Sequence, residues 1–182
     1  MSVKLPDEEK HEILTLLSRT RDEYVAELDA VPAALQDKSA AQERWSALQC
    51  AEHVVNSEEG MFKLWEKLAQ QGTSDRATDE KIRTGLANRS NKRVAPERVR
   101  PLGHIQSLTE ARERFLAARN KTIALVDGIP AEELRNKVVP HPLVGTADGY
   151  QLFQIMAMHS ARHAAQTHET ATQLASLRGG KD

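Results

Sequence analysis

Two histidines near the C-terminus, His159 and His163, lie four residues apart in the segment GYQLFQIMAMHSARHAAQTHE. On an α-helix, residues four apart lie one turn above the other on the same face. That face also carries the mostly apolar side chains Leu152, Ile155, Met156, Gln166, Thr170, Leu174 and Leu177. Both imidazoles should therefore point toward a hydrophobic core. Two inward imidazoles at this spacing can bind one metal ion, as in the metal sites of helical bundles.

A third ligand is needed, because a catalytic zinc ion usually takes three protein ligands. His53 fits best, since it lies at the edge of the apolar face of another predicted helix. His104 and His141 fall in predicted loops and are kept as reserves, whereas His11 and His168 should be exposed. The alternative without metal is a set of core histidines that are hydrogen-bonded to their neighbours.

Three other side chains near these histidines each have two interpretations. Glu58 lies near the centre of an apolar helix face, where a carboxylate is costly without a partner. It could orient a ligand imidazole by accepting its second N–H, or pair with an arginine such as Arg162. Gln166, one turn beyond His163, could orient a ligand in the same way or line the core. Cys50 could be a nucleophile, but a small buried hydrophobe is the commoner role.

Four long amphipathic segments should position these residues: 6–29, 46–70, 107–128, and a last one that begins at 146–148 and ends at 177. Ser46 with Gln49, and Ser107 with Glu110, have the spacing of capping boxes at helix starts. On the second helix, Glu52, Glu59 and Glu66 mark the expected solvent side. Trp45 and Tyr150 are expected to pack rather than to contact a substrate.

The connections complete the predicted architecture. A short helix is expected over 79–87, a Pro- and Gly-containing linker up to 106, and a loop over 138–149. Residues 73–106 should be the least regular part, and no sustained strand alternation is present. Four long helices with one extended crossover predict an all-α four-helix bundle, in one domain spanning residues 1–182.

Composition excludes several classes of function. The chain has 182 residues and a formal net charge of −1, so no overall field attracts nucleic acid or an anionic membrane. Aromatic residues make up 4%, which is too few for base-stacking platforms. One cysteine, no apolar signal segment and no long apolar stretch predict a soluble cytoplasmic protein. The run of arginines and lysines from Arg83 to Arg100 is expected to be a solvated connection, with a phosphate or substrate-carboxylate contact as the weaker alternative.

Three pieces of the chain, in order, resemble the DinB-like/YfiT superfamily of four-helix-bundle metalloenzymes. They are Trp45-Ser46 followed by AEHVVNSEE, then VAPERVRPLG before the third helix, and HPLVGTADGYQLFQIMAMHSARHAAQ leading into the last helix. The resemblance implies that His53, His159 and His163 hold a divalent ion, usually zinc or nickel, with open positions for water.

The resemblance also implies a range of reactions. Some family members transfer or isomerise with low-molecular-weight thiols such as bacillithiol or mycothiol, so the expected function is a metal-dependent thiol S-transferase or isomerase acting on a small molecule. The alternatives are a metal-dependent hydrolase and a non-catalytic metal-binding bundle. Ala164, Ala165 and Gln166 follow His163, so the HxxxHxE pattern of the sulfoxide-synthase branch is absent, which argues against iron-dependent oxygen chemistry, and the chain lacks the HExxH of metalloproteases. Bundles of this kind often pair through a helix face, so a homodimer is expected.

Overall fold

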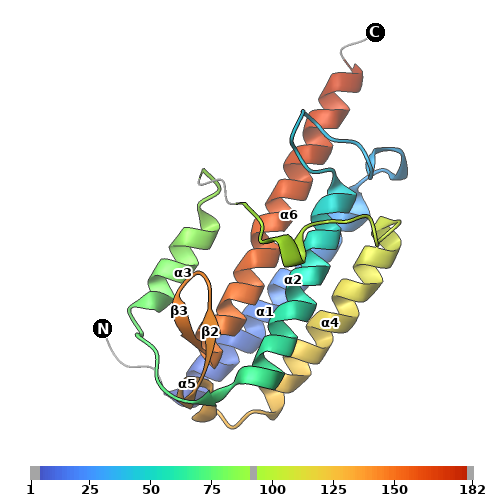
Figure 1. The fold of residues 1–182 in the computed structure, drawn as a ribbon. Helices are drawn as coiled ribbons and strands as arrows, with labels where there is room; N and C mark the ends of the chain where they lie inside the picture. The colour runs from blue at the N-terminus through green and yellow to red at the C-terminus, as the bar shows by residue number, and fades with distance from the viewer. Residues whose placement is uncertain (1–4, 91–93, 180–182) are drawn as a thin grey trace.

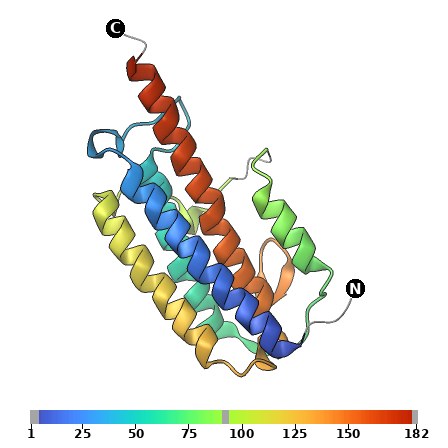
Figure 2. The same ribbon diagram turned by 180° about the vertical axis from the view of Figure 1, so that it is seen from behind.

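The computed structural model describes residues 5–90 and 94–179. Four long helices make up the bundle: α1 (Pro6–Ala30), α2 (Ala47–Leu68), α4 (Leu108–Gly128) and α6 (Gly149–Gly179) (Figure 1). Helices α1 and α2 each pack against both α4 and α6, so the four enclose a common core. The C-terminal turns of α6 extend beyond the other helices at one end of the bundle (Figure 2). The predicted all-α four-helix bundle is confirmed.

The two helix starts predicted from capping patterns are present. At α2, Ser46 Oγ accepts a hydrogen bond from the Gln49 amide, and Gln49 Oε1 accepts one from the Ser46 amide, which completes a capping box. At α4, Ser107 Oγ accepts from the Glu110 amide, but the Glu110 carboxylate bonds the amide of Gln106 instead of closing the box. Both caps satisfy amides that have no partner within the helix.

Smaller elements flank the bundle. They are the single-turn helices η1 (Ala33–Leu35) and η2 (Glu97–Val99), the helices α3 (Thr78–Ala87) and α5 (Glu133–Asn136), and the strands β1 (Gln70–Gln71), β2 (Lys137–His141) and β3 (Gly145–Asp148). Helix α3 packs on α6 and η2 on α2. The predicted short helix at 79–87 is thereby confirmed.

The three strands form an antiparallel sheet in the order β1-β2-β3, with Val139 opposite Ala147. The predicted loop over 138–149 was therefore wrong, and the last helix begins at Gly149, one residue after the predicted start at 146–148. The strands are too short to show a period of two, and their pairing depends on tertiary burial, because Val139 and Ala147 are fully buried. Gly145, with φ +76°, supplies the left-handed backbone of the hairpin turn.

Helix α6 begins at a glycine because its backbone comes close to both α2 and α5 there. A Cβ atom added to Gly149 would lie 2.8 Å from the Trp65 ring and 2.9 Å from the Leu134 carbonyl oxygen. The outer elements are tied together by Arg135 of α5, which donates to Glu9 of α1, Asp79 of α3 and Asp148 of β3.

The apolar core has two large clusters, one around Trp65 and Phe153 and the other around Tyr24 and Phe115. A third, small cluster of Ile82, Leu86 and Ile155 lies where α3 packs on α6. The Tyr24 and Phe115 rings pack edge to face with centroids 5.0 Å apart. Arg119 lies where the two large clusters meet, and its guanidinium lies over the Phe115 ring at 5.1 Å. In the described parts of the chain, no helix has the length and apolar character needed to cross a membrane.

Candidate metal centre

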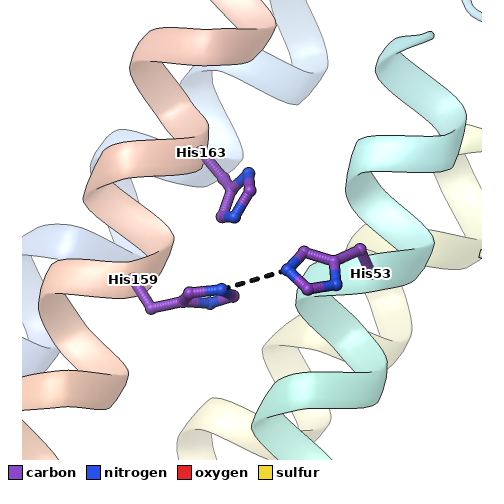
Figure 3. Close-up of side chains that lie close together, drawn as sticks. All are labelled: His53, His159 and His163. Carbon is purple, nitrogen blue, oxygen red and sulfur yellow. Dashed lines mark hydrogen bonds between the residues drawn. The ribbon is translucent and has the colours of Figure 1, made fainter. Parts of the chain in front are cut away.

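Three imidazoles converge between two helices of the bundle. His53 comes from α2 and His159 and His163 come from α6, and Figure 3 shows the three rings turned toward one another. One nitrogen from each lies within 4.8 Å of the other two. His53 Nε2 and His159 Nε2 are 3.1 Å apart. Two ligands bound at about 2.1 Å to a tetrahedral zinc ion are about 3.4 Å apart, so this spacing fits a shared ion with little adjustment.

Two of the rings are oriented through their second nitrogen. His53 Nδ1 lies 2.8 Å from the main-chain oxygen of Val99, which can only accept, so Nδ1 carries the proton and Nε2 keeps its lone pair. His163 Nδ1 lies 3.2 Å from Cys50 Sγ, which directs the Nε2 atom of that ring to the centre. Such partners fix the tautomer of a metal ligand and its ring orientation.

Burial keeps the three imidazoles neutral. It lowers the pKa of His159 to about 3, with the neighbouring His53 and the positive charges of Arg119 and Arg162 acting in the same direction. Burial also lowers the pKa of His163 well below its usual value. For His53, burial lowers the pKa, and the bond to Val99 opposes the shift. Neutral imidazole is the form that binds metal, so the donor set fits a divalent ion.

The structure separates the remaining histidines as follows. His168 is exposed and pairs with Glu27, and His11 and His104 are exposed as well. His141, one of the two reserves, is buried and lines the cavity next to the centre, but it is not part of the converging group.

The partner of Glu58 is an arginine, but not Arg162. Arg119 of α4 donates to both Glu58 carboxylate oxygens, at 2.6 and 2.9 Å, and both side chains are buried. Arg119 also donates to the Leu17 carbonyl oxygen of α1 and to Ser160 Oγ of α6. Glu58 thus belongs to an ion pair that joins all four helices, and among the described residues its hydrogen bonds run to Arg119 and Thr122 rather than to a histidine.

The position of Glu52 differs from the prediction. The helical pattern puts it on the solvent side of α2, yet it is buried and accepts hydrogen bonds from the amides of Leu102, Gly103 and His104. This carboxylate holds the crossover against α2, next to His53. A helical pattern could not reveal it, because its partners lie about 50 residues further along the chain.

A cavity of about 1020 Å³ opens beside the histidines. Gln166 lines it and is partly buried, and Trp45 lines it with its ring centroid 4.9 Å from that of His53, so Trp45 is in reach of a ligand. Tyr150 packs in the core as expected, and its hydroxyl donates to Glu12. The sequence does not reveal Val99 as a partner of His53, because a main-chain oxygen carries no residue signature.

Comparison with known proteins identifies the family and the fold. The family model of the DinB superfamily matches residues 16–167, which include the three histidines. The solved structure of YfiT from Bacillus subtilis, described as a probable metal-dependent hydrolase with an unusual four-helix bundle topology, aligns with TM-score 0.64 and 13% identity over 96% of this chain and 93% of that chain.

Two further structures share the fold. A conserved protein from Enterococcus faecalis aligns with TM-score 0.60 and 13% identity over 96% of this chain and 99% of that chain. An uncharacterized protein from Clostridium difficile 630 aligns with TM-score 0.53 and 18% identity over 92% of this chain and 95% of that chain. No curated protein matches the chain.

Proposed function

Because the chain belongs to the DinB superfamily and three of its imidazoles converge between two helices, we propose that the protein is a metal-dependent enzyme. His53, His159 and His163 hold one divalent ion, zinc or nickel, and a small-molecule substrate reacts in the adjoining cavity. The observation that carries the proposal is the placement of three ligand nitrogens within 4.8 Å of one another.

A bound divalent ion would supply Lewis acidity, which lowers the pKa of a water molecule or of a substrate thiol. The residues of the chain prepare the site. Val99 and Cys50 hold the second nitrogens of His53 and His163, so that the lone pairs of the other nitrogens converge. Apolar side chains, among them Met61 and Leu143, also line the cavity.

For the reaction we propose thiol-dependent S-transfer or isomerisation, with a low-molecular-weight thiol such as bacillithiol or mycothiol as co-substrate. The cavity of about 1020 Å³ supports this, because it reaches the upper end of the range for single small-molecule sites and has room for two reactants. Cys50 does not supply the thiolate: burial raises its pKa to about 12.

Metal-dependent hydrolysis is the second candidate. It is favoured by the structural likeness to YfiT, which is described as a probable metal-dependent hydrolase. The three histidines serve either reaction, so the requirement for a thiol distinguishes the two.

The metal is tested first, by elemental analysis of protein purified without a histidine tag. We expect about one divalent ion per chain, loss of the metal in His159→Ala and in His163→Ala, and full retention in His168→Ala. The control is matched, because His168 lies on the same helix but is exposed. Loss of metal in all three variants alike would contradict the proposed ligand set.

The reaction is tested with a panel of thiols, including glutathione, mycothiol and bacillithiol, each offered with an electrophile. We expect metal-loaded protein to accelerate conjugation of the thiol to the electrophile. Protein treated with a chelator and the His53→Ala variant should show only the uncatalysed rate. Equal rates in all samples would remove thiol transfer, and cleavage of esters or amides without a thiol would support the hydrolase.

A further inference from the structure

The mouth of the cavity is rich in arginine. Among the described residues, the cavity is lined by Arg44, Arg89, Arg98, Arg100 and Arg162, against a single carboxylate, Glu43. The chain as a whole has a net charge of −1, so this excess of positive charge is local. The basic run from Arg83 to Arg100, expected to be a solvated connection, supplies three of these side chains.

These arginines differ in their partners. Arg89 forms an ion pair with Glu169, which compensates its charge. Arg100 donates to the main-chain oxygen of Ala95. Within the described ranges, Arg44, Arg98 and Arg100 form no ion pair with a carboxylate, and Arg44 and Arg98 are exposed. Their guanidinium groups are therefore available to an anion that enters the cavity.

The segments that carry these arginines also border the histidines. Arg44 is followed by Trp45, whose ring lies beside that of His53, and Arg98 is followed by Val99, whose oxygen bonds the same histidine. Figure 1 shows η2 in front of the space between α2 and α6. A ligand between the mouth and the histidines would therefore contact both kinds of side chain.

The rest of the lining is largely apolar, with Trp45, Met61, Leu64, Leu143 and Ile155 among its members. We infer that the substrate is a carboxylic acid with an apolar body, whose carboxylate is held by the mouth arginines Arg44 and Arg98 while its reactive group lies at the three histidines. The planar guanidinium fork matches a carboxylate, and the charge strengthens the hydrogen bonds. This inference rests on the proposed function and names the substrate class of the same site.

Binding of hydrocinnamate is compared with binding of hydrocinnamide, a neutral amide of the same shape, by titration calorimetry and by fluorescence of Trp45. We expect the acid to bind at least about tenfold more tightly, and less tightly at high salt. The variants Arg98→Gln and Arg44→Gln should each bind the acid about tenfold more weakly than the parent protein does, and bind the amide with nearly unchanged affinity. Arg19→Gln is the matched control, because Arg19 pairs with Glu23 on α1 and does not line the cavity.

Each titration is repeated after metal removal by a chelator, because a carboxylate could also bind the metal ion itself. The inference is supported if the protein still binds the acid more tightly than the amide after metal removal, and if this preference is lost in Arg98→Gln. That result would stand even if the metal or thiol experiments fail. Equal binding of acid and amide, no binding of either, equal loss in Arg19→Gln, or tighter binding of phenyl phosphate than of the acid would overturn it. None of these results would alter the metal content on which the proposed function depends.

Discussion

In the candidate metal centre, two of the three imidazoles are oriented by a hydrogen-bond partner on the side of the ring that faces away from the centre. For His53 this partner is the Val99 main-chain oxygen, and for His163 it is Cys50 Sγ. A thiol so deeply buried is a poor nucleophile but an adequate hydrogen-bond partner. The role of Cys50 is therefore to position His163.

Cys50→Ala should weaken metal binding by about tenfold to a hundredfold, because His163 Nδ1 would lose its partner and the ring its fixed tautomer. Cys50→Ser keeps a hydrogen-bonding oxygen at nearly the same place and should retain most of the affinity. Competition with a chromophoric chelator measures both. Equal affinities in the parent protein and both variants would show that Cys50 does not position the ligand.

His141 should make the protein sensitive to acid. Burial and the charge of Arg98 lower its pKa from 6.5 to about 4. Between these values the unfolded chain binds a proton that the folded protein does not, so the free energy of unfolding falls as pH drops from 6.5 toward 4.

We expect His141→Gln to remove up to about 2 kcal/mol of the stability difference between pH 7 and pH 5. Urea unfolding of the parent protein and the variant at both pH values measures this. The result is a difference of differences, so the contributions of the other buried histidines cancel. An unchanged pH dependence in the variant would contradict the lowered pKa.

At the scale of elements, Glu52 determines how the crossover meets α2. Its carboxylate accepts three main-chain hydrogen bonds from residues 102–104, at 2.9 to 3.1 Å. The same crossover contains η2, which carries Val99 over His53 and Arg98 at the mouth of the cavity. One buried carboxylate thus couples the crossover to the metal centre.

Glu52→Gln should destabilise the protein by about 2 kcal/mol, because it replaces charge-assisted hydrogen bonds and presents an amide donor to amide donors. Hydrogen exchange at the amides of residues 102–104 should accelerate with it. Glu66→Gln, an exposed position on the same helix, should change stability by less than about 0.5 kcal/mol. The same loss in both variants would argue against a specific role of Glu52.

At the scale of the whole molecule, the buried pair of Arg119 and Glu58 joins all four helices at the junction of the two large core clusters. Arg119 donates to α1 through the Leu17 oxygen and to α6 through the Met156 oxygen. The hydrogen bonds of this pair can all form only when the four helices pack in the correct register. Removal of one partner leaves the other as a buried charge without a partner.

Arg119→Met should therefore lower the free energy of unfolding by about 3 to 5 kcal/mol. Adding Glu58→Met should recover part of this loss, because no uncompensated carboxylate remains. Arg112→Met, which breaks a half-exposed pair with Asp29, should cost less than about 1 kcal/mol. Denaturant unfolding measures these three variants and the Glu58→Met single variant, and a double variant less stable than the sum of its single changes would refute the coupling.

The sequence alone determined the features that depend on local pattern. Periodic apolar residues and capping boxes located the four long helices to within a few residues, because both signals act within a turn or two of the chain. The spacing of His159 and His163 predicted, for the same reason, that both side chains lie on one face, and both belong to the converging histidine group. The family resemblance, confirmed by the match over residues 16–167, brought in His53 beside the argument from its helix face.

Only the tertiary structure decided what depends on distant partners. The strands β2 and β3 are too short for a periodic signal, and adjacent residues in each, Val138 with Val139 and Ala147 with Asp148, are buried in the folded molecule. The helical pattern puts Glu52 on the solvent side of α2 and Glu58 on the apolar face, yet both are buried. Glu52 binds a crossover about 50 residues away, and Glu58 binds an arginine about 60 residues away. The sequence put Glu58 but not Glu52 in the interior, and it identified the partner of neither, because a partner is set by how the helices pack and not by local spacing.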